Sequence, residues 1–141
     1  MGDSGPRACV LVINDNQAML DLLRDRLREA GYDVRTSLQT LHVDRIREIA
    51  PDIIVQDLVF GGEQDEGWQF LTMARLDPAL SPIPMVLCTG AVETVTNAVM
   101  AERLDRLGVR VLLKPFDLDE LLAAVAESLA AQKLLDQARD A

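Results

Sequence analysis

The chain has 141 residues and a mass of 15.5 kDa, a length that fits one domain able to bury most of its apolar surface. Its formal net charge of −9 argues against nucleic acid as a direct partner, because phosphate binding needs a basic patch. Apolar residues make up 49% of the chain and aromatic residues 4%, a balance that favours an α/β or all-α protein with an aliphatic core.

The termini and the cysteines indicate the compartment. Residues 1–7 are small and polar, so we predict a disordered N-terminus without the apolar segment of a secretion signal. No stretch approaches membrane-spanning length. Cys9 and Cys88 fall inside predicted strands without metal-ligand spacing, so we expect two buried thiols and no disulfide. These features predict a cytoplasmic protein that contacts no membrane.

Apolar runs with strand character alternate along the chain with apolar residues at helical spacing. The predicted strands are 9–13, 32–37, 51–57, 85–88 and 109–113. The predicted helices are 17–30, 41–50, 68–76, 92–107 and 118–129. Gly31 is expected to end the first helix, and His42 is expected to be a solvent-exposed residue inside the second. Asp117 and Glu120 have the spacing of a capping box at the start of the last helix.

The third strand carries the first functional signal. Ile53, Ile54 and Val55 form an uninterrupted β-branched run, which is typical of a central parallel strand covered on both faces. The run ends at Asp57. Ligands of open α/β sheets bind beyond the carboxyl ends of the strands, so Asp57 is a candidate site residue. By itself it could equally be a cap of the following segment.

Alternating strands and helices predict a doubly wound α/β fold with a five-stranded parallel sheet, since right-handed crossovers return the chain to the same edge. We assign one domain to residues 8–130. Residues 131–141 are predicted to be a helix extension or a linker, because Leu134 and Leu135 lie off the apolar stripe of the last helix.

Parallel strands bring their carboxyl ends together, so polar residues after four of the predicted strands should converge. These residues are Asn14, Asp15, Asp57, Thr89 and Lys114. Asp15 and Asp57 are oxygen ligands suited to Mg²⁺. Thr89 supplies a hydroxyl and Lys114 a positive charge, both suited to a phosphoryl group. Asp57 would then be the nucleophile that forms an aspartyl-phosphate.

With these residues at these strand ends, the chain resembles the response-regulator receiver domains of two-component signalling over residues 8–130. The resemblance implies a flavodoxin-like (βα)5 fold with strand order 2-1-3-4-5. It also implies that Asp57 accepts phosphate, that Thr89 and Lys114 bind the phosphoryl group, and that Asp15 and Asp57 hold Mg²⁺. The backbone carbonyl of Val59 would complete the metal ligands, with Asn14 acting through water.

Some positions depart from the pattern of that family. Asn14 stands where the first acidic residue is usual, and Val111 stands where an aromatic switch residue is common. The loop after Asp57 also differs and is longer. These departures motivate a second hypothesis, a pseudo-receiver that binds partners without phosphorylation. A flavodoxin-like cofactor protein or a small phosphohydrolase is disfavoured, because no glycine-rich loop follows the first strand and no second Asp follows Asp57 at two residues.

The resemblance further implies the partners. A sensor histidine kinase or a phosphotransfer protein would supply the phosphoryl group, and a downstream protein or output domain would receive the signal. Met100, Leu104 and Leu107 give the fourth predicted helix a second apolar edge, so a homodimer through the fourth and fifth helices is a further hypothesis. Beyond transferring phosphate to itself and losing it, the domain is not expected to be an enzyme.

Overall fold

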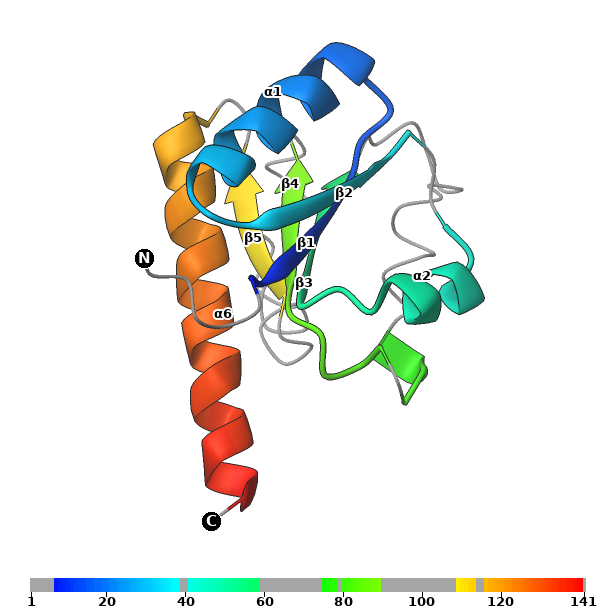
Figure 1. Cartoon of the computed structure of the whole chain (residues 1–141), viewed down its shortest axis with the longest axis vertical. Helices are drawn as coiled ribbons and strands as arrows, with labels where there is room; N and C mark the ends of the chain where they lie inside the picture. Colours follow the sequence, from blue (N-terminus) through cyan, green and yellow to red (C-terminus); the bar gives the residue numbers. More distant parts are fainter. Residues whose placement is uncertain are drawn as a thin grey trace.

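A computed structural model of the chain describes residues 7–38, 41–58, 75–78, 80–89, 109–113 and 116–140. Its strands form one five-stranded sheet of order β2-β1-β3-β4-β5, and every neighbouring pair is parallel (Figure 1). The strands are β1 Cys9–Ile13, β2 Asp33–Ser37, β3 Ile53–Leu58, β4 Met85–Thr89 and β5 Val109–Leu113. The helices are α1 Gln17–Glu29, α2 Val43–Ile49 and α6 Leu118–Asp140. The predicted doubly wound sheet and its strand order are confirmed.

Three predicted segments are not covered. The third predicted helix lies almost entirely, and the fourth entirely, outside the described residues. Residues 1–6 of the predicted N-terminal tail also lie outside them. Among the helices that the structure does describe, none combines the length and the apolar character needed to cross a bilayer.

The core has two parts because the alternating side chains of the sheet face opposite layers. On one face, α1 and α6 lie against the sheet (Figure 1). There Leu23 of α1 and Val125 of α6 pack with Val12 and Val55. On the other face, Ile46 of α2 packs with buried residues that include Leu11 and Ile54. Burial on both faces explains why β3 has an uninterrupted apolar run and no alternation.

Both ends of α1 have local causes. Asn16 is its N-cap, and the side-chain oxygen accepts a 3.0 Å hydrogen bond from the backbone N–H of Met19. At the other end Gly31 has a φ of 100°, a left-handed conformation that glycine adopts without a Cβ clash. Gly31 therefore ends the helix as predicted, and the chain turns directly into β2.

The prediction for His42 was wrong in its position. His42 is the N-cap of α2, and its Nδ1 accepts a hydrogen bond of 3.2 Å from the backbone N–H of Asp44. Its side chain is exposed, as expected. The helix ends at Ala50, a residue without the freedom of glycine, in the left-handed region at φ 51°. Pro51 follows and cannot continue the helix.

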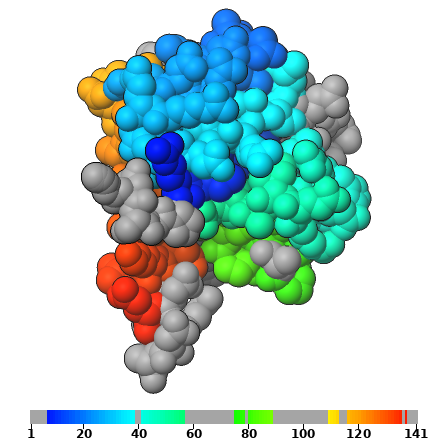
Figure 2. Space-filling view, viewed as in Figure 1, coloured from blue at the N-terminus to red at the C-terminus, as the bar shows by residue number. Residues whose placement is uncertain are grey.

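The last helix, α6, begins at the predicted capping box. The Glu120 N–H donates to Asp117 Oδ1 at 3.0 Å, and the Asp117 N–H donates to Glu120 Oε1 at 3.4 Å. Past the last buried residue, Val125, the helix runs on to Asp140 and extends beyond the sheet (Figures 1 and 2). Leu134 and Leu135 on this extension are 66% and 54% exposed.

Candidate functional site at the carboxyl edge of the sheet

The register of the strands brings the predicted site positions to one edge. Ile13 pairs with Gln56, so Asn14 and Asp57 are the next positions at one level of β1 and β3. Asp57 pairs in turn with Cys88, the residue before Thr89. Neighbouring strands lie about 4.8 Å apart. The backbone positions of Asn14, Asp57 and Cys88 therefore lie side by side, and Thr89 follows one residue further along β4.

The loop between β1 and α1 is held by hydrogen bonds of its own. The Asn14 N–H donates to the carbonyl oxygen of Ser37 in β2 at 3.0 Å. The side-chain Oδ1 of Asn14 accepts a hydrogen bond of 2.9 Å from the Asn16 N–H, and Asn16 caps α1. Asn14 is buried, with 8% of its surface exposed. These contacts fix the backbone on both sides of Asp15.

Asp15 has a different environment. Its side chain is exposed, and no group among the described residues forms a hydrogen bond or an ion pair with it. A carboxylate that is not engaged by the protein can bind a cation or a ligand. The fixed loop thus presents, beside the end of β3, a carboxylate that no described residue engages.

The residues at this edge fit a magnesium ion by their chemistry. Mg²⁺ prefers oxygen ligands, keeps several waters and binds through one or two carboxylates together with phosphate oxygens. Asp15 offers such a carboxylate. Asp57 lies on the neighbouring strand β3, at the level of Asn14, the residue before Asp15. Among the side chains that the structure describes, no three His, Cys, Asp or Glu residues form a metal cluster by themselves. A metal bound here would therefore depend on Asp57, water and the phosphoryl group for its other ligands.

A cleft of about 970 Å³ opens at this edge between α1 and the start of α6. Its floor is formed by the strands, at Val12, Val55 and Cys88. Asn14 and Asp15 line its upper part. The remaining walls come from the two helices and include Met19, Leu22, Leu23, Arg26, Phe116, Leu118 and Asp119.

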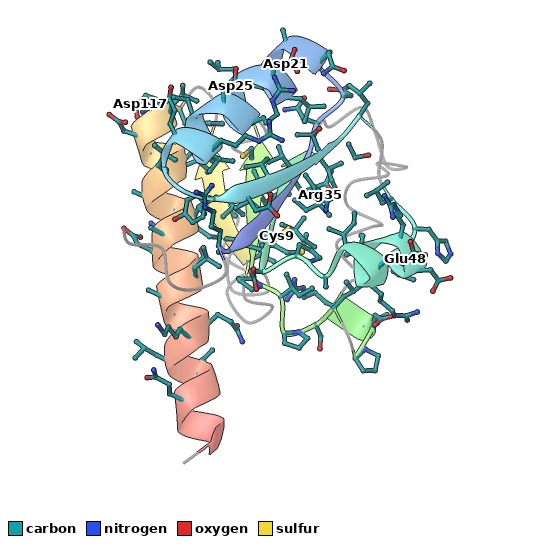
Figure 3. The ribbon with its side chains drawn as sticks, in the orientation of Figure 1. Cys9, Asp21, Asp25, Arg35, Glu48 and Asp117 are labelled. Carbon is teal, nitrogen blue, oxygen red and sulfur yellow. The ribbon has the colours of Figure 1, made fainter. Side chains whose placement is uncertain are left out.

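An ion pair closes one side of the cleft. Arg26 of α1 donates to Asp119 of α6 at 3.1 Å and to Glu29 at 3.2 Å. Asp117, the residue before α6, also lines the cleft, and Figure 3 shows it at the end of α6 that lies toward α1. The acidic residues that line the cleft are Asp15, Asp117 and Asp119, and most of the other lining residues are apolar.

Several predicted site residues cannot be placed. Lys114 and Val59 lie outside the described residues, as does the loop that follows Asp57. For Asp57 and Thr89 the backbone is described in β3 and β4, but their side chains are outside the description. Val111 lies in β5, partly buried against the core on the α2 side of the sheet. An aliphatic residue therefore occupies the position at which the resemblance suggested an aromatic ring.

Sequence reasoning missed three features of the site. The capping role of Asn16 was signalled by an Asn directly before a helical repeat. The contact that engages the oxygen of Asn14 had no comparable signal, since it depends on the path of the loop. Phe116, Met19 and Leu22 were also not anticipated as walls of a cleft, because they come together only when α1 and α6 pack on the same face.

Comparison with known proteins agrees with the resemblance to receiver domains. The family model described as the response regulator receiver domain matches residues 10–126. The chain is 28% identical over 130 residues to the DNA-binding dual master transcriptional regulator RpaA of Synechocystis, covering 92% of this chain and 52% of RpaA. It is 32% identical over 127 residues to the transcriptional regulator NtrC of Rhizobium meliloti, covering 89% of this chain and 25% of NtrC. The chain thus spans about half of the first relative and a quarter of the second.

Solved structures agree on the fold. The chemotaxis response regulator CheY4 of Vibrio cholerae aligns with a TM-score of 0.69 at 22% identity, covering 86% of this chain and 98% of CheY4. NtrX of Brucella abortus aligns with a TM-score of 0.76 at 24% identity, covering 95% of this chain and 29% of NtrX. Since the family model matches most of the chain, this protein belongs to the response regulator receiver domains.

Proposed function

We propose that this receiver domain is a phosphorylation switch in which Asp57 accepts a phosphoryl group from a histidine kinase or a phosphotransfer protein. The observation that carries the proposal is the register of β1, β3 and β4. It aligns Asp57 with Asn14 and with the end of β4, next to the exposed carboxylate of Asp15. A carboxylate at the carboxyl edge of a parallel sheet is where such folds bind ligands.

The proposed reaction is a transfer between two carriers. An oxygen of the Asp57 carboxylate attacks phosphorus, and the bond from phosphorus to the donor histidine nitrogen breaks. The electron pair of that bond returns to the imidazole nitrogen. The domain then carries a mixed anhydride and releases no separate product. We therefore propose a self-modifying switch and not an enzyme that acts on an external substrate.

Other residues at the edge would stabilise the transferring group. Bound Mg²⁺ supplies positive charge to the phosphoryl oxygens, and Asp15 is the described residue that would hold it. Thr89 and Lys114 are proposed to bind the phosphoryl oxygens through a hydroxyl and an ammonium group. The backbone carbonyl of Val59 is proposed as a further metal ligand.

The proposed partners follow from the family and the relatives. RpaA and NtrC are transcriptional regulators longer than this chain, so a signal passed to an output domain or a separate protein is a proposal here. The acidic charge of −9 argues against direct nucleic-acid binding by the domain itself. We also propose that the domain is cytoplasmic. The homodimer through the fourth and fifth predicted helices also stays a proposal, since residues 90–108 lie outside the described residues.

Intact mass after treatment with acetyl phosphate and Mg²⁺ tests the proposal. The wild-type protein should gain about 80 Da, the mass of one phosphoryl group. The variant Asp57→Asn should gain nothing, while keeping the thermal unfolding midpoint of a folded domain. A wild-type protein that stays unmodified would favour the pseudo-receiver hypothesis. Full labelling of Asp57→Asn would exclude Asp57 as the acceptor.

A further inference from the structure

The side chain of Asn14 has a defined orientation. Its Oδ1 accepts the 2.9 Å hydrogen bond from the Asn16 N–H, and a backbone N–H can donate only to the oxygen of the amide. With Oδ1 turned toward the loop, Nδ2 and its two N–H groups occupy the other branch of the side chain. The orientation is supported by burial, because only 8% of the Asn14 surface is exposed.

The Nδ2 group has no acceptor among the residues that the structure describes. Asn14 nevertheless lines the cleft at the carboxyl edge. The register sets its backbone at the level of Asp57 on the neighbouring strand. The amide donor of this largely buried residue therefore stands beside the proposed phosphoacceptor, at a position where an oxygen-rich anion can receive its hydrogen bonds.

We infer that Asn14 binds the phosphoryl group on Asp57 directly, with Nδ2 donating to a phosphoryl oxygen. This inference rests on the proposed function. A carboxylate at position 14 would repel the phosphoryl oxygens and could hold them only through a cation. The amide attracts them without one. The site consequently accepts phosphate when Mg²⁺ is scarce. Its phosphorylation should therefore depend less on Mg²⁺ than that of a site with acidic residues at both positions 14 and 15.

The variant Asn14→Asp removes the Nδ2 hydrogen-bond donor of Asn14 and keeps the rest of the loop. Aspartate has nearly the same shape and still accepts the Asn16 N–H, so the loop is preserved, but at neutral pH it cannot donate. The matched control is Asn16→Asp, which adds the same charge two residues along the loop. Aspartate is as good an N-cap as asparagine, so α1 is preserved as well.

The experiment measures the rate of labelling by acetyl phosphate, by intact mass, with excess EDTA and with saturating Mg²⁺. In EDTA the wild-type protein and Asn16→Asp should be labelled at rates that agree within about twofold. Asn14→Asp should be slower by about 10-fold or more, the value of a hydrogen bond to a charged group. Saturating Mg²⁺ should remove most of this difference. A second readout is the side-chain ¹⁵NH₂ resonance of Asn14, which should shift on phosphorylation and exchange more slowly with water.

The outcomes separate the inference from the function on which it rests. If Asp57 is labelled, but Asn14→Asp reacts in EDTA as fast as the wild type, the proposed function stands and the inference is wrong. An Asn14 ¹⁵NH₂ resonance that does not move on phosphorylation also overturns the inference. Equal slowing in Asn14→Asp and Asn16→Asp would assign the effect to charge and overturn it too. A wild-type protein that is never labelled, with or without Mg²⁺, overturns both.

Discussion

The two edges of the sheet use their acidic residues differently. At the amino edge, Asp52 precedes β3, and its carboxylate accepts a 2.7 Å hydrogen bond from the N–H of Cys9 at the start of β1. The Asp52 N–H donates to the Cys9 carbonyl oxygen at 2.8 Å. At the carboxyl edge, Asp15 follows the other end of β1 and is engaged by no described residue. Figure 3 shows Cys9 at the amino end of β1 and Asp117 by the opposite edge.

The contrast is one of engagement: the backbone uses the carboxylate of Asp52, while no described residue uses that of Asp15, the acid to which we assign a chemical role. Asp52 joins two strands and stabilises the fold. Burial raises the pKa of the Cys9 thiol beside it, and the carboxylates of Asp33 and Asp52 raise it further. That thiol therefore stays protonated near neutral pH and is poorly reactive. We therefore interpret the amino edge as a scaffold and propose the carboxyl edge as the ligand site.

We expect the largest difference in Mg²⁺ binding and in labelling when one acidic residue at each edge is replaced by its amide. Asp15→Asn should weaken Mg²⁺ binding and slow labelling at limiting Mg²⁺ by about 10- to 100-fold, because a metal ligand loses its charge. Asp52→Asn makes the same chemical change at the other edge and should label like the wild type. Isothermal titration with Mg²⁺ and labelling by mass are the measurements. Equal defects in both variants would show that the edges do not differ.

Adding an acid at the carboxyl edge should have the opposite effect. Asn14→Asp should bind Mg²⁺ about 10-fold more tightly than the wild type, since a carboxylate replaces a neutral amide near the ion. Isothermal titration with Mg²⁺ measures the affinity of both proteins. Unchanged affinity would mean that position 14 does not sense the metal.

Removing the acid at the amino edge should cost stability. Asp52→Ala loses the acceptor for the Cys9 N–H, and we expect the free energy of unfolding to fall by about 1 kcal/mol, because the pair is exposed to solvent. Chemical denaturation measures this change, with Asp15→Ala as the matched control. If Asp15→Ala lost as much stability, the carboxylate at the carboxyl edge would have a structural role as well.

The smallest effect concerns Ala50, which lies just before the amino edge at φ 51°. Glycine adopts this conformation without strain, although it loses more chain entropy on folding. Ala50→Gly should therefore raise the free energy of unfolding by about 0.5 kcal/mol and leave labelling unchanged. A lower stability would mean that the contacts of the Ala50 methyl group outweigh the strain.

Much of the fold could be predicted because its signals are local. β-branched runs marked β1 and β3, and Gly31 and the Asp117 capping box marked helix ends. The strand order came from the family resemblance and not from spacing. What the sequence could not reveal depends on contacts between distant segments. The bond from Cys9 to Asp52 spans 43 positions, so nothing near Asp52 distinguished it from Asp15.

The candidate site was only partly predictable for a similar reason. Residue types and strand ends placed Asn14, Asp15 and Asp57 at one edge, and the register agrees. Sequence alone treated Asn14 as a missing charge. The buried, oriented amide became visible only with the loop, because its orientation is set by the N–H of Asn16. The cleft likewise requires α1 and α6 to be packed together.

The most direct test of the central claim locates the phosphoryl group within β3. Asp52 precedes this strand and Asp57 lies near its carboxyl end, and both fall in one tryptic peptide, which follows Arg47 and ends at Arg75. After labelling with acetyl phosphate and Mg²⁺, borohydride reduction converts the acyl phosphate into a stable alcohol that fragmentation can assign. We predict modification of Asp57 and none of Asp52. Modification at Asp52, or at acids throughout the peptide, would contradict the assignment of the chemistry to the carboxyl edge.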